Sequence, residues 1–203
     1  FIFAAELMGS GQIARRLTNL IKGMFGHRTG GIGHTAIVGS MAFGSVSGSA
    51  PATVAALGKL MYPELRNSGY REKFSLGLIV SSAETALLIP PSITLIIYGW
   101  ITGTSIMGLF AGGLAVGIVL GLAFAALVML ESVRHGVGRG TRPGAGELRE
   151  AFFASFWALG LPVIILGGIY SGFFTPTEAA AVGSLGAAAL AALREVQRAN
   201  LAR

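Results

Sequence analysis

The segment "SSAETALLIPPSITLIIYGW", Ser81 to Trp100, decides the fold of this chain. It has the composition of a membrane-spanning helix, but it contains a carboxylate, Glu84, and a proline pair, Pro90 and Pro91. Each proline lacks a backbone N–H and crowds the preceding helical turn, so the helix is expected to break there. A charge near the centre of a bilayer costs about 3 kcal/mol on insertion scales, and intramembrane acids usually mark an ion pathway. We therefore predict a broken helix that serves a function.

The composition around this segment indicates a membrane protein. Hydrophobic residues make up 53% of the 203 residues, charged residues 12%, and the mean hydropathy is +0.70, whereas soluble domains carry roughly 25% charge. No Asp, Glu, Lys or Arg occurs from Thr85 to Leu130. Because a spanning helix needs about 20 apolar residues, this run is long enough for two crossings. The fold class that follows is all-α and polytopic.

The net charge of +6 resides in segments between the apolar stretches. A nucleic-acid interface would interleave basic and aromatic residues on a soluble domain, whereas basic loops between apolar helices are typical of the cytoplasmic side of a membrane protein. The chain has no cysteine, so it forms no disulfide. The basic segments are Arg15 to Arg28, Lys59 to Lys73, Arg134 to Arg149 and Arg194 to Arg203.

Enzymatic chemistry is not expected. Ser47 lacks the Gly-x-Ser-Gly context of an intramembrane protease, and no histidine follows in a later spanning helix. The three histidines, His27, His34 and His135, lack the spacing of metal ligands. We therefore expect neither a cofactor nor a metal site beyond a coupling cation.

A re-entrant hairpin is predicted before the broken helix. The apolar stretch from Gly30 to Met61 is interrupted by "FGSVSGSAPAT", Phe43 to Thr53, and has basic residues on both sides. If both flanks are cytoplasmic, the stretch enters the membrane and returns, with its tip at Ser45 to Ala50. Non-helical backbone at membrane depth requires protein or a water-filled cavity around it. The tip is therefore a candidate binding site.

The remaining segments complete the predicted organisation. An amphipathic helix over Gly9 to Phe25 is expected to lie on the cytoplasmic interface with its apolar face toward lipid. A helix over Ile106 to Leu130 carries a ridge of glycines, Gly113, Gly117 and Gly121, for close helix packing. The expected domains are residues 1–29 as the end of a membrane helix followed by the interfacial helix, 30–130 as a first transport repeat, 131–150 as a cytoplasmic linker, 151–193 as the start of a second repeat, and 194–203 as a basic tail.

A short internal repeat supports two related halves. Pro51 to Gly58 aligns with Pro176 to Gly183, and a Ser-Gly pair precedes each block. Each proline fits the first turn of a new helix, and Thr175 with Glu178 forms a capping box. Buried helix N-termini attract anions, and unwound carbonyls suit a cation. Inverted repeats with discontinuous helices are typical of secondary transporters.

Five motifs occur in one order over nearly the whole chain. They are "ARRLTNLIKGMFGHRTGGIG" (Ala14 to Gly33), "FGSVSGSAPATVAALG" (Phe43 to Gly58), "YPELRNSGY" (Tyr62 to Tyr70), "LIPPSITLIIYGWITGTSI" (Leu88 to Ile106) and "LPVIILGGIYSGFFTPTEAAAVG" (Leu161 to Gly183). Together they resemble the large membrane subunit of tripartite ATP-independent periplasmic (TRAP) transporters, the DctM-like proteins.

This resemblance implies a multi-pass subunit of a sodium-coupled symporter in the bacterial inner membrane. Such a transporter imports organic anions, such as dicarboxylates or sugar acids, by an elevator-type movement. Its partners would be a small membrane subunit and a periplasmic substrate-binding protein. Family members are longer and continue to a second broken helix, so we expect a partial chain. The alternative is a truncated accessory fragment that does not transport.

The predicted site residues come from the hairpin tips and the helix break. Family members commonly have glycines and a threonine where this chain has Ala83-Glu84-Thr85-Ala86, so the role of Glu84 rests on its depth alone. The predicted cation-binding residues are Ser47, Gly48, Ser49, Ala86, Leu87, Ile89 and Pro90. The predicted substrate-binding residues are Thr53, Glu84, Ser92, Thr175 and Thr177.

Overall fold

The described part of the chain is entirely helical, as the sequence predicts. A computed structural model describes residues 12–137, 144–175, 178, 181–182 and 185–186. Its elements are α2 (Gln12–Phe25), α3 (Gly31–Ser47), α4 (Ala50–Asn67), α5 (Glu72–Ala83), the 3₁₀ helix η1 (Glu84–Leu87), α6 (Ile93–Thr102), α7 (Ile106–His135) and α8 (Ala145–Tyr170).

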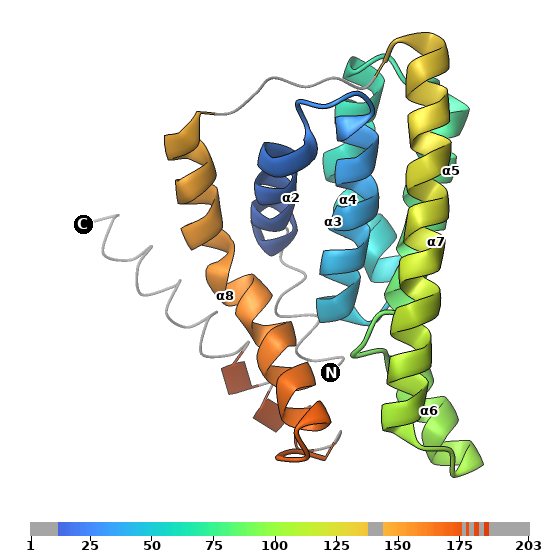
Figure 1. The fold of residues 1–203 in the computed structure, drawn as a ribbon, viewed down its shortest axis with the longest axis vertical. Helices are drawn as coiled ribbons and strands as arrows, with labels where there is room; N and C mark the ends of the chain where they lie inside the picture. The colour runs from blue at the N-terminus through green and yellow to red at the C-terminus, as the bar shows by residue number, and fades with distance from the viewer. Residues whose placement is uncertain (1–11, 138–143, 176–177, 179–180, 183–184, 187–203) are drawn as a thin grey trace.

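Helices α3 and α4 form the predicted hairpin. Both outer ends lie at the end of the molecule where α7 finishes, and the turn between them lies well short of the start of α7 (Figure 1). Gly48 makes the turn in the left-handed conformation, with φ 60° and ψ 15°, and its N–H donates to the Gly44 carbonyl at 2.7 Å. Ser49 is extended, and Pro51 lies in the first turn of α4. The Gly-Ser-Ala-Pro sequence therefore ends one helix and begins the next.

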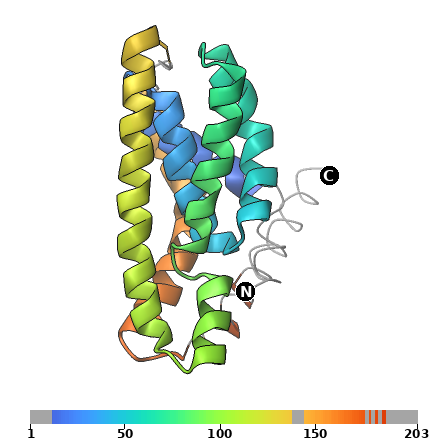
Figure 2. The same cartoon turned by 90° about the vertical axis from the view of Figure 1, so that its right-hand side faces the viewer.

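The helix break also occurs where the proline pair predicts it. Helix α5 ends at Ala83, one turn of 3₁₀ helix follows, and α6 begins only at Ile93. The Pro90–Pro91 peptide bond is cis. Figure 2 shows α6 continuing below α5, beyond an irregular connection. Ser92 starts α6 as its N-cap, and its hydroxyl accepts from the Leu95 N–H.

The glycine ridge of α7 packs against this break. A Cβ built on Gly113 would lie 2.6 Å from the Leu88 carbonyl oxygen, and one on Gly117 would lie 3.0 Å from Ile89 Cγ1. Gly121 faces Met41 of α3. The predicted packing role of the ridge is confirmed, because only glycine lets α7 approach the irregular backbone so closely.

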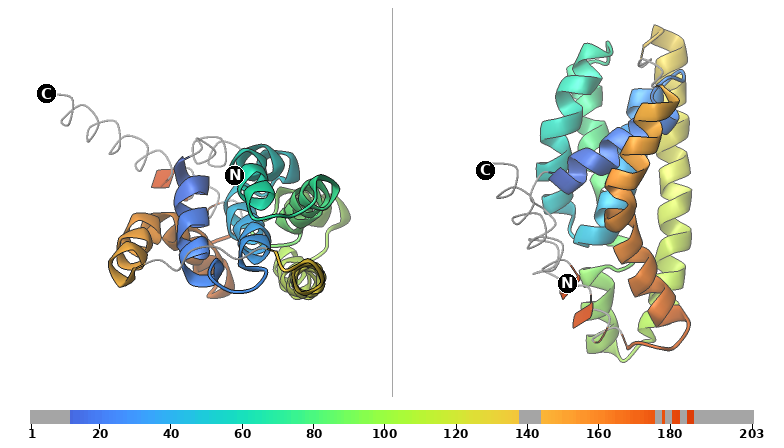
Figure 3. Two further views of the ribbon diagram at one scale, coloured as in Figure 1. Left: turned by 90° about the horizontal axis from the view of Figure 1, so that it is seen from above. Right: turned by 90° about the vertical axis from the view of Figure 1, so that its left-hand side faces the viewer.

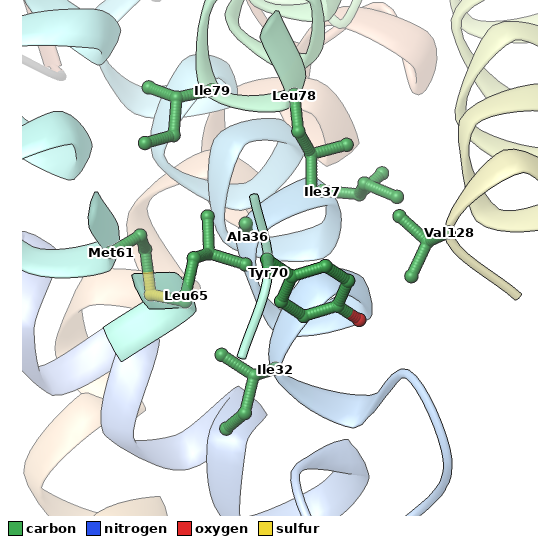
Figure 4. Packing of buried hydrophobic residues seen from close by; sticks show 9 residues of the cluster. All are labelled: Ile32, Ala36, Ile37, Met61, Leu65, Tyr70, Leu78, Ile79 and Val128. Atoms are coloured by element: carbon green, nitrogen blue, oxygen red, sulfur yellow. The ribbon is translucent and has the colours of Figure 1, made fainter. Parts of the chain in front are cut away.

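A hydrophobic core joins α3, α4, α5 and α7 at the end of the molecule where α7 finishes, which we call the basic end because the basic connections lie there. Its nine buried residues include Tyr70, whose hydroxyl points toward α7 (Figure 4). That hydroxyl forms a hydrogen bond of 2.7 Å with Ser132 Oγ, and both residues are buried. Burial raises the pKa of the Tyr70 phenol, which keeps it a neutral hydrogen-bonding group. The start of the hairpin, the start of α5 and the end of α7 are thereby joined.

Helix α2 lies between α8 and the hairpin rather than against open surroundings. It packs on α3 and α8, and two views show it crossing between them (Figures 1 and 3). Its apolar residues Ala14, Leu17 and Leu20 are buried, so most of this face is covered by protein. The expectation that the face lies on lipid is therefore wrong. On the other side, Lys22 forms an ion pair of 2.5 Å with Glu64 of α4.

Two helix bounds differ from the predicted linker. Helix α7 continues to His135, and α8 begins at Ala145, so both enter the segment 131–150. The polar residues there suit solvent-exposed helical turns, which composition alone does not separate from a loop. Among the described residues, α7 is the one helix long and apolar enough to cross a membrane by length and composition, and α6 is a shorter apolar helix.

Substituting Gly113 tests the close packing of α7 on the break. We expect Gly113→Ala to lower the free energy of unfolding of the permease by about 1–3 kcal/mol, because its methyl group would overlap the Leu88 carbonyl. Gly112→Ala is the matched control, since a Cβ there meets nothing within 4 Å and alanine favours the helix by about 1 kcal/mol. Thermal unfolding of the two variants measures the difference. Equal melting temperatures would contradict this packing.

Candidate functional site

The hairpin tip is built around a cluster of two polar side chains and one backbone carbonyl. Ser47 Oγ and Thr53 Oγ1 lie 3.1 Å apart, and both side chains are buried. The Thr53 hydroxyl donates to the Ser49 carbonyl at 2.8 Å, and the Ser47 hydroxyl lies 3.3 Å from the same oxygen. The polar groups at the end of α3 and the start of α4 therefore satisfy one another across the turn.

The tip abuts the irregular segment of the broken helix. A Cβ on Gly48 would lie 3.0 Å from the Pro91 carbonyl oxygen and 3.3 Å from the Ile93 nitrogen. One turn earlier, a Cβ on Gly44 would lie 2.5 Å from the Ala86 Cβ. The structure therefore brings the tip next to the predicted break residue Ala86 and next to Pro91, which directly follows the predicted residue Pro90.

Ser92 spans the break with two hydrogen bonds. Its hydroxyl donates to the Leu87 carbonyl at 2.6 Å and accepts from the Leu95 N–H at 3.4 Å. Upstream, the Thr85 carbonyl accepts from the N–H groups of both Leu88 and Ile89. The predicted cation ligand Leu87 therefore has its carbonyl in use, and the predicted substrate residue Ser92 acts here as a helix cap.

The donor set at this junction suits a hard cation. Hydroxyl and carbonyl oxygens are the ligands that such ions prefer, and Ser47, Ser49 and Thr53 supply them at one point of the tip. Each of these oxygens already has a hydrogen-bond partner within the tip. A cation bound here would replace hydrogen bonds among the hydroxyls, whose hydrogens can rotate away from the ion.

Glu84 lies apart from this cluster. It is the first residue of η1, and its side chain is exposed, whereas its neighbours Ala83, Thr85 and Ala86 are buried. Within the described residues its carboxylate has no hydrogen bond or ion pair. The sequence places Glu84 within two turns of the proline pair, and the structure turns it away from the hairpin tip.

The second polar block begins as the sequence predicts. The Thr175 N–H donates to Glu178 Oε2 at 2.8 Å, and the Glu178 N–H donates to Thr175 Oγ1 at 3.3 Å. This reciprocal pair is the predicted capping box. No hydrogen bond among the described residues joins Thr175 to the first tip. Phe174 packs instead with Phe110 and Ile169, and Thr177 lies outside the described residues.

One buried polar contact beside the break was not anticipated from the sequence. Ser40 of α3 and Ser82 of α5 are both buried, and their hydroxyl oxygens lie 3.0 Å apart. Ser40, Gly44 and Gly48 recur every four residues and meet Ser82, Ala86 and Pro91 in order. The four-residue spacing of these small residues is the feature of the sequence that could have predicted this close packing.

Comparison with known proteins shows which family the chain belongs to. The whole chain, residues 1–203, matches the family described as "Tripartite ATP-independent periplasmic transporter, DctM component". The chain belongs to this family. It is 45% identical over 181 residues to the ectoine TRAP transporter large permease protein TeaC of Halomonas elongata, covering 89% of this chain and 42% of TeaC.

Other DctM-family relatives give the same result. The chain is 39% identical over 184 residues to the 2,3-diketo-L-gulonate TRAP transporter large permease protein YiaN of Escherichia coli, covering 91% of this chain and 43% of YiaN. It is 38% identical over 185 residues to the C4-dicarboxylate TRAP transporter large permease protein DctM of Pseudomonas aeruginosa, covering 91% and 43%. These relatives are transporter permeases and not enzymes, as expected. The chain spans less than half of their length.

Thr53 tests whether hydroxyl bonding holds the tip. We expect Thr53→Val, which keeps the shape of the side chain, to lower the free energy of unfolding by about 1 kcal/mol, because a buried hydrogen bond to the Ser49 carbonyl is lost. Thr94→Val on the exposed face of α6 is the control. Chemical denaturation of the purified permease compares them. If both variants match the wild type, the tip does not depend on this hydroxyl.

Proposed function

We propose that this chain is part of the membrane subunit of a sodium-coupled secondary importer of organic anions, working by an elevator-type movement. The observation that carries the proposal is the contact of the hairpin tip with the broken helix, where Gly48 abuts Pro91 and Ile93. The hairpin turn and the broken helix bring backbone and hydroxyl oxygens close together. Secondary transporters use this kind of arrangement for coupling ions.

The sodium part of the proposal is supported by the donor chemistry. Ser47, Ser49 and Thr53 offer only oxygen ligands, and no acidic side chain contacts them among the described residues. A neutral oxygen set binds a monovalent cation without the strong preference for a divalent ion that carboxylates would add. Sodium would be a co-substrate that enters and leaves with each cycle.

The organic-anion part rests on helix N-termini and on the relatives. Helix α4 begins at the hairpin tip and α6 begins at the break, so two N-termini with partial positive charge lie at the same junction. Relatives are named for ectoine, 2,3-diketo-L-gulonate and C4-dicarboxylates. These compounds share a carboxylate group, which suits such N-termini.

The proposed location is the bacterial inner membrane, with several crossings. Helix α7 is a candidate spanning helix. The α2–α3 connection, the α4–α5 connection and the end of α7 lie at one end of the molecule (Figure 1), and these segments contain Arg28, Arg71 and Arg134. The positive-inside rule places that end in the cytoplasm. Both outer ends of the hairpin lie there, so the tip would reach the membrane interior from the cytoplasmic side.

The partners we propose are a small membrane subunit and a periplasmic substrate-binding protein. They follow from the family description as a tripartite periplasmic transporter. One relative, from Oleidesulfovibrio alaskensis, is named isethionate TRAP transporter permease protein DctMQ. The binding protein would deliver the anion to the side opposite the basic end.

Sodium dependence of uptake tests the function directly. The complete complex is reconstituted in proteoliposomes with its cognate binding protein, and the solute is chosen by thermal-shift screening of that binding protein against organic acids. We expect uptake with a sodium gradient and little uptake when potassium replaces sodium. Uptake that is unchanged in potassium would contradict sodium coupling.

A matched pair of serine variants locates the ion. Ser47→Ala removes a hydroxyl that faces Thr53, so we expect it to raise the sodium concentration needed for half-maximal uptake. Ser45→Ala is the control, because the Ser45 hydroxyl bonds only to the Ala42 carbonyl within α3. Equal sodium dependence in the two variants would remove Ser47 from the ion site.

A further inference from the structure

Helix α5 has one buried face and one exposed face along its whole length. The exposed face is apolar in the middle, where Leu76 is 48% exposed and Val80 is 50% exposed. Gly77 lies beside them, and Lys73 and Glu84 mark the two ends of the face. The opposite face is covered by the rest of the chain and consists of Ser75, Leu78, Ile79, Ser82 and Ala83.

The lower end of this face lies at the middle height of α7. Leu88 contacts Gly113 and Gly117, the eighth and twelfth residues of the 30-residue helix α7, and Glu84 lies one helical turn before Leu88, nearer to the middle of α7 (Figure 2). If α7 spans the membrane, the Glu84 carboxylate is therefore deep in the bilayer. A carboxylate facing lipid at that depth costs about 3 kcal/mol. Lipid is an unfavourable cover for this face.

The outer face of α7 differs in charge. Its exposed residues Val116, Val119 and Leu122 are 56%, 67% and 65% exposed, and no charged residue occurs from Ile106 to Leu130. Bulky aliphatic side chains without charge suit lipid. The α5 face has charged residues at its ends and a glycine at its centre, where a Cβ built on Gly77 would meet nothing within 4 Å. Small residues at such a position let another helix approach.

We propose that the α5 face, formed by Lys73, Leu76, Gly77, Val80 and Glu84, is an internal docking surface covered by the part of the large permease that lies outside this chain. The relatives supply the argument for this occupant, because the chain covers only 42% of TeaC and 43% of YiaN. Glu84 then faces a hydrogen-bonding or basic group of that part. The proposal rests on the proposed function in taking α7 as membrane-spanning.

Lipid quenching of a fluorescent label tests the cover. A cysteine-free full-length permease receives one bimane label, at Val80 or at Val119, and is placed as single copies in nanodiscs containing brominated lipid. We expect strong quenching at Val119 and weak quenching at Val80. Equal quenching at both positions overturns the proposal and leaves the membrane placement intact. Absence of quenching at both overturns the membrane placement and the proposal with it.

The same labels separate the possible occupants. The comparison is repeated with and without the small membrane subunit. Quenching at Val80 that stays weak without the subunit supports a cover from the large permease itself. Quenching at Val80 that becomes strong when the subunit is left out assigns the face to the small subunit and overturns the proposed occupant.

Substitutions at Glu84 test the polar end of the surface by a readout independent of transport. We expect Glu84→Leu to lower the melting temperature of the full-length permease, because its partner group loses a hydrogen bond in a covered site. Glu84→Gln, which keeps a hydrogen-bonding side chain, is expected to lose less. Glu72→Leu at the polar end of α5 is the control. A melting temperature of Glu84→Leu equal to or above that of the wild type overturns the role of Glu84.

Discussion

The close approach of glycines to the broken helix is the constraint on which the rest of the structure depends. Gly44 of α3 and Gly48 of the hairpin turn meet the break from one side, and Gly113 and Gly117 of α7 meet it from the other. Irregular backbone at membrane depth must be enclosed by protein. Side chains larger than hydrogen would hold α3 and α7 away from Ala86, Leu88 and Pro91, and the break would then face surroundings that cannot satisfy its polar groups.

Most elements of this arrangement follow from local sequence. The proline pair predicts the break, the Gly-Ser-Ala-Pro turn predicts the hairpin, and Thr175 with Glu178 predicts a capping box. Each depends on the backbone chemistry of a few adjacent residues. The four-residue spacing of Gly113, Gly117 and Gly121 predicts that α7 is approached closely, and the structure adds which segment does so.

The features that sequence did not predict depend on contacts between distant segments. The apolar face of α2 has the pattern of an interfacial helix, yet α3 and α8 cover it. The sequence does not distinguish Ser40 and Ser82 from other helical serines, because only the folded hairpin brings their hydroxyls together. Glu84 has the expected position along the chain, but its direction is set by the 3₁₀ turn, which places Thr85 and Ala86 inward and the carboxylate outward.

The contacts at the break also bear on how an elevator-type movement would divide the molecule. Sliding of the hairpin past α5 would break the Ser40–Ser82 hydrogen bond and separate Gly44 from Ala86, while α7 is held to both by the core around Tyr70. Buried hydroxyls that lose their partners are costly, so α3, α4, α5, η1 and α7 favour moving as one body. Helix α8 contacts α2 more extensively than it contacts α3. Because α2 packs on α3 as extensively as on α8, and its Lys22 is paired with Glu64 of α4, α2 joins α8 to this body, and an elevator-type movement would carry them together.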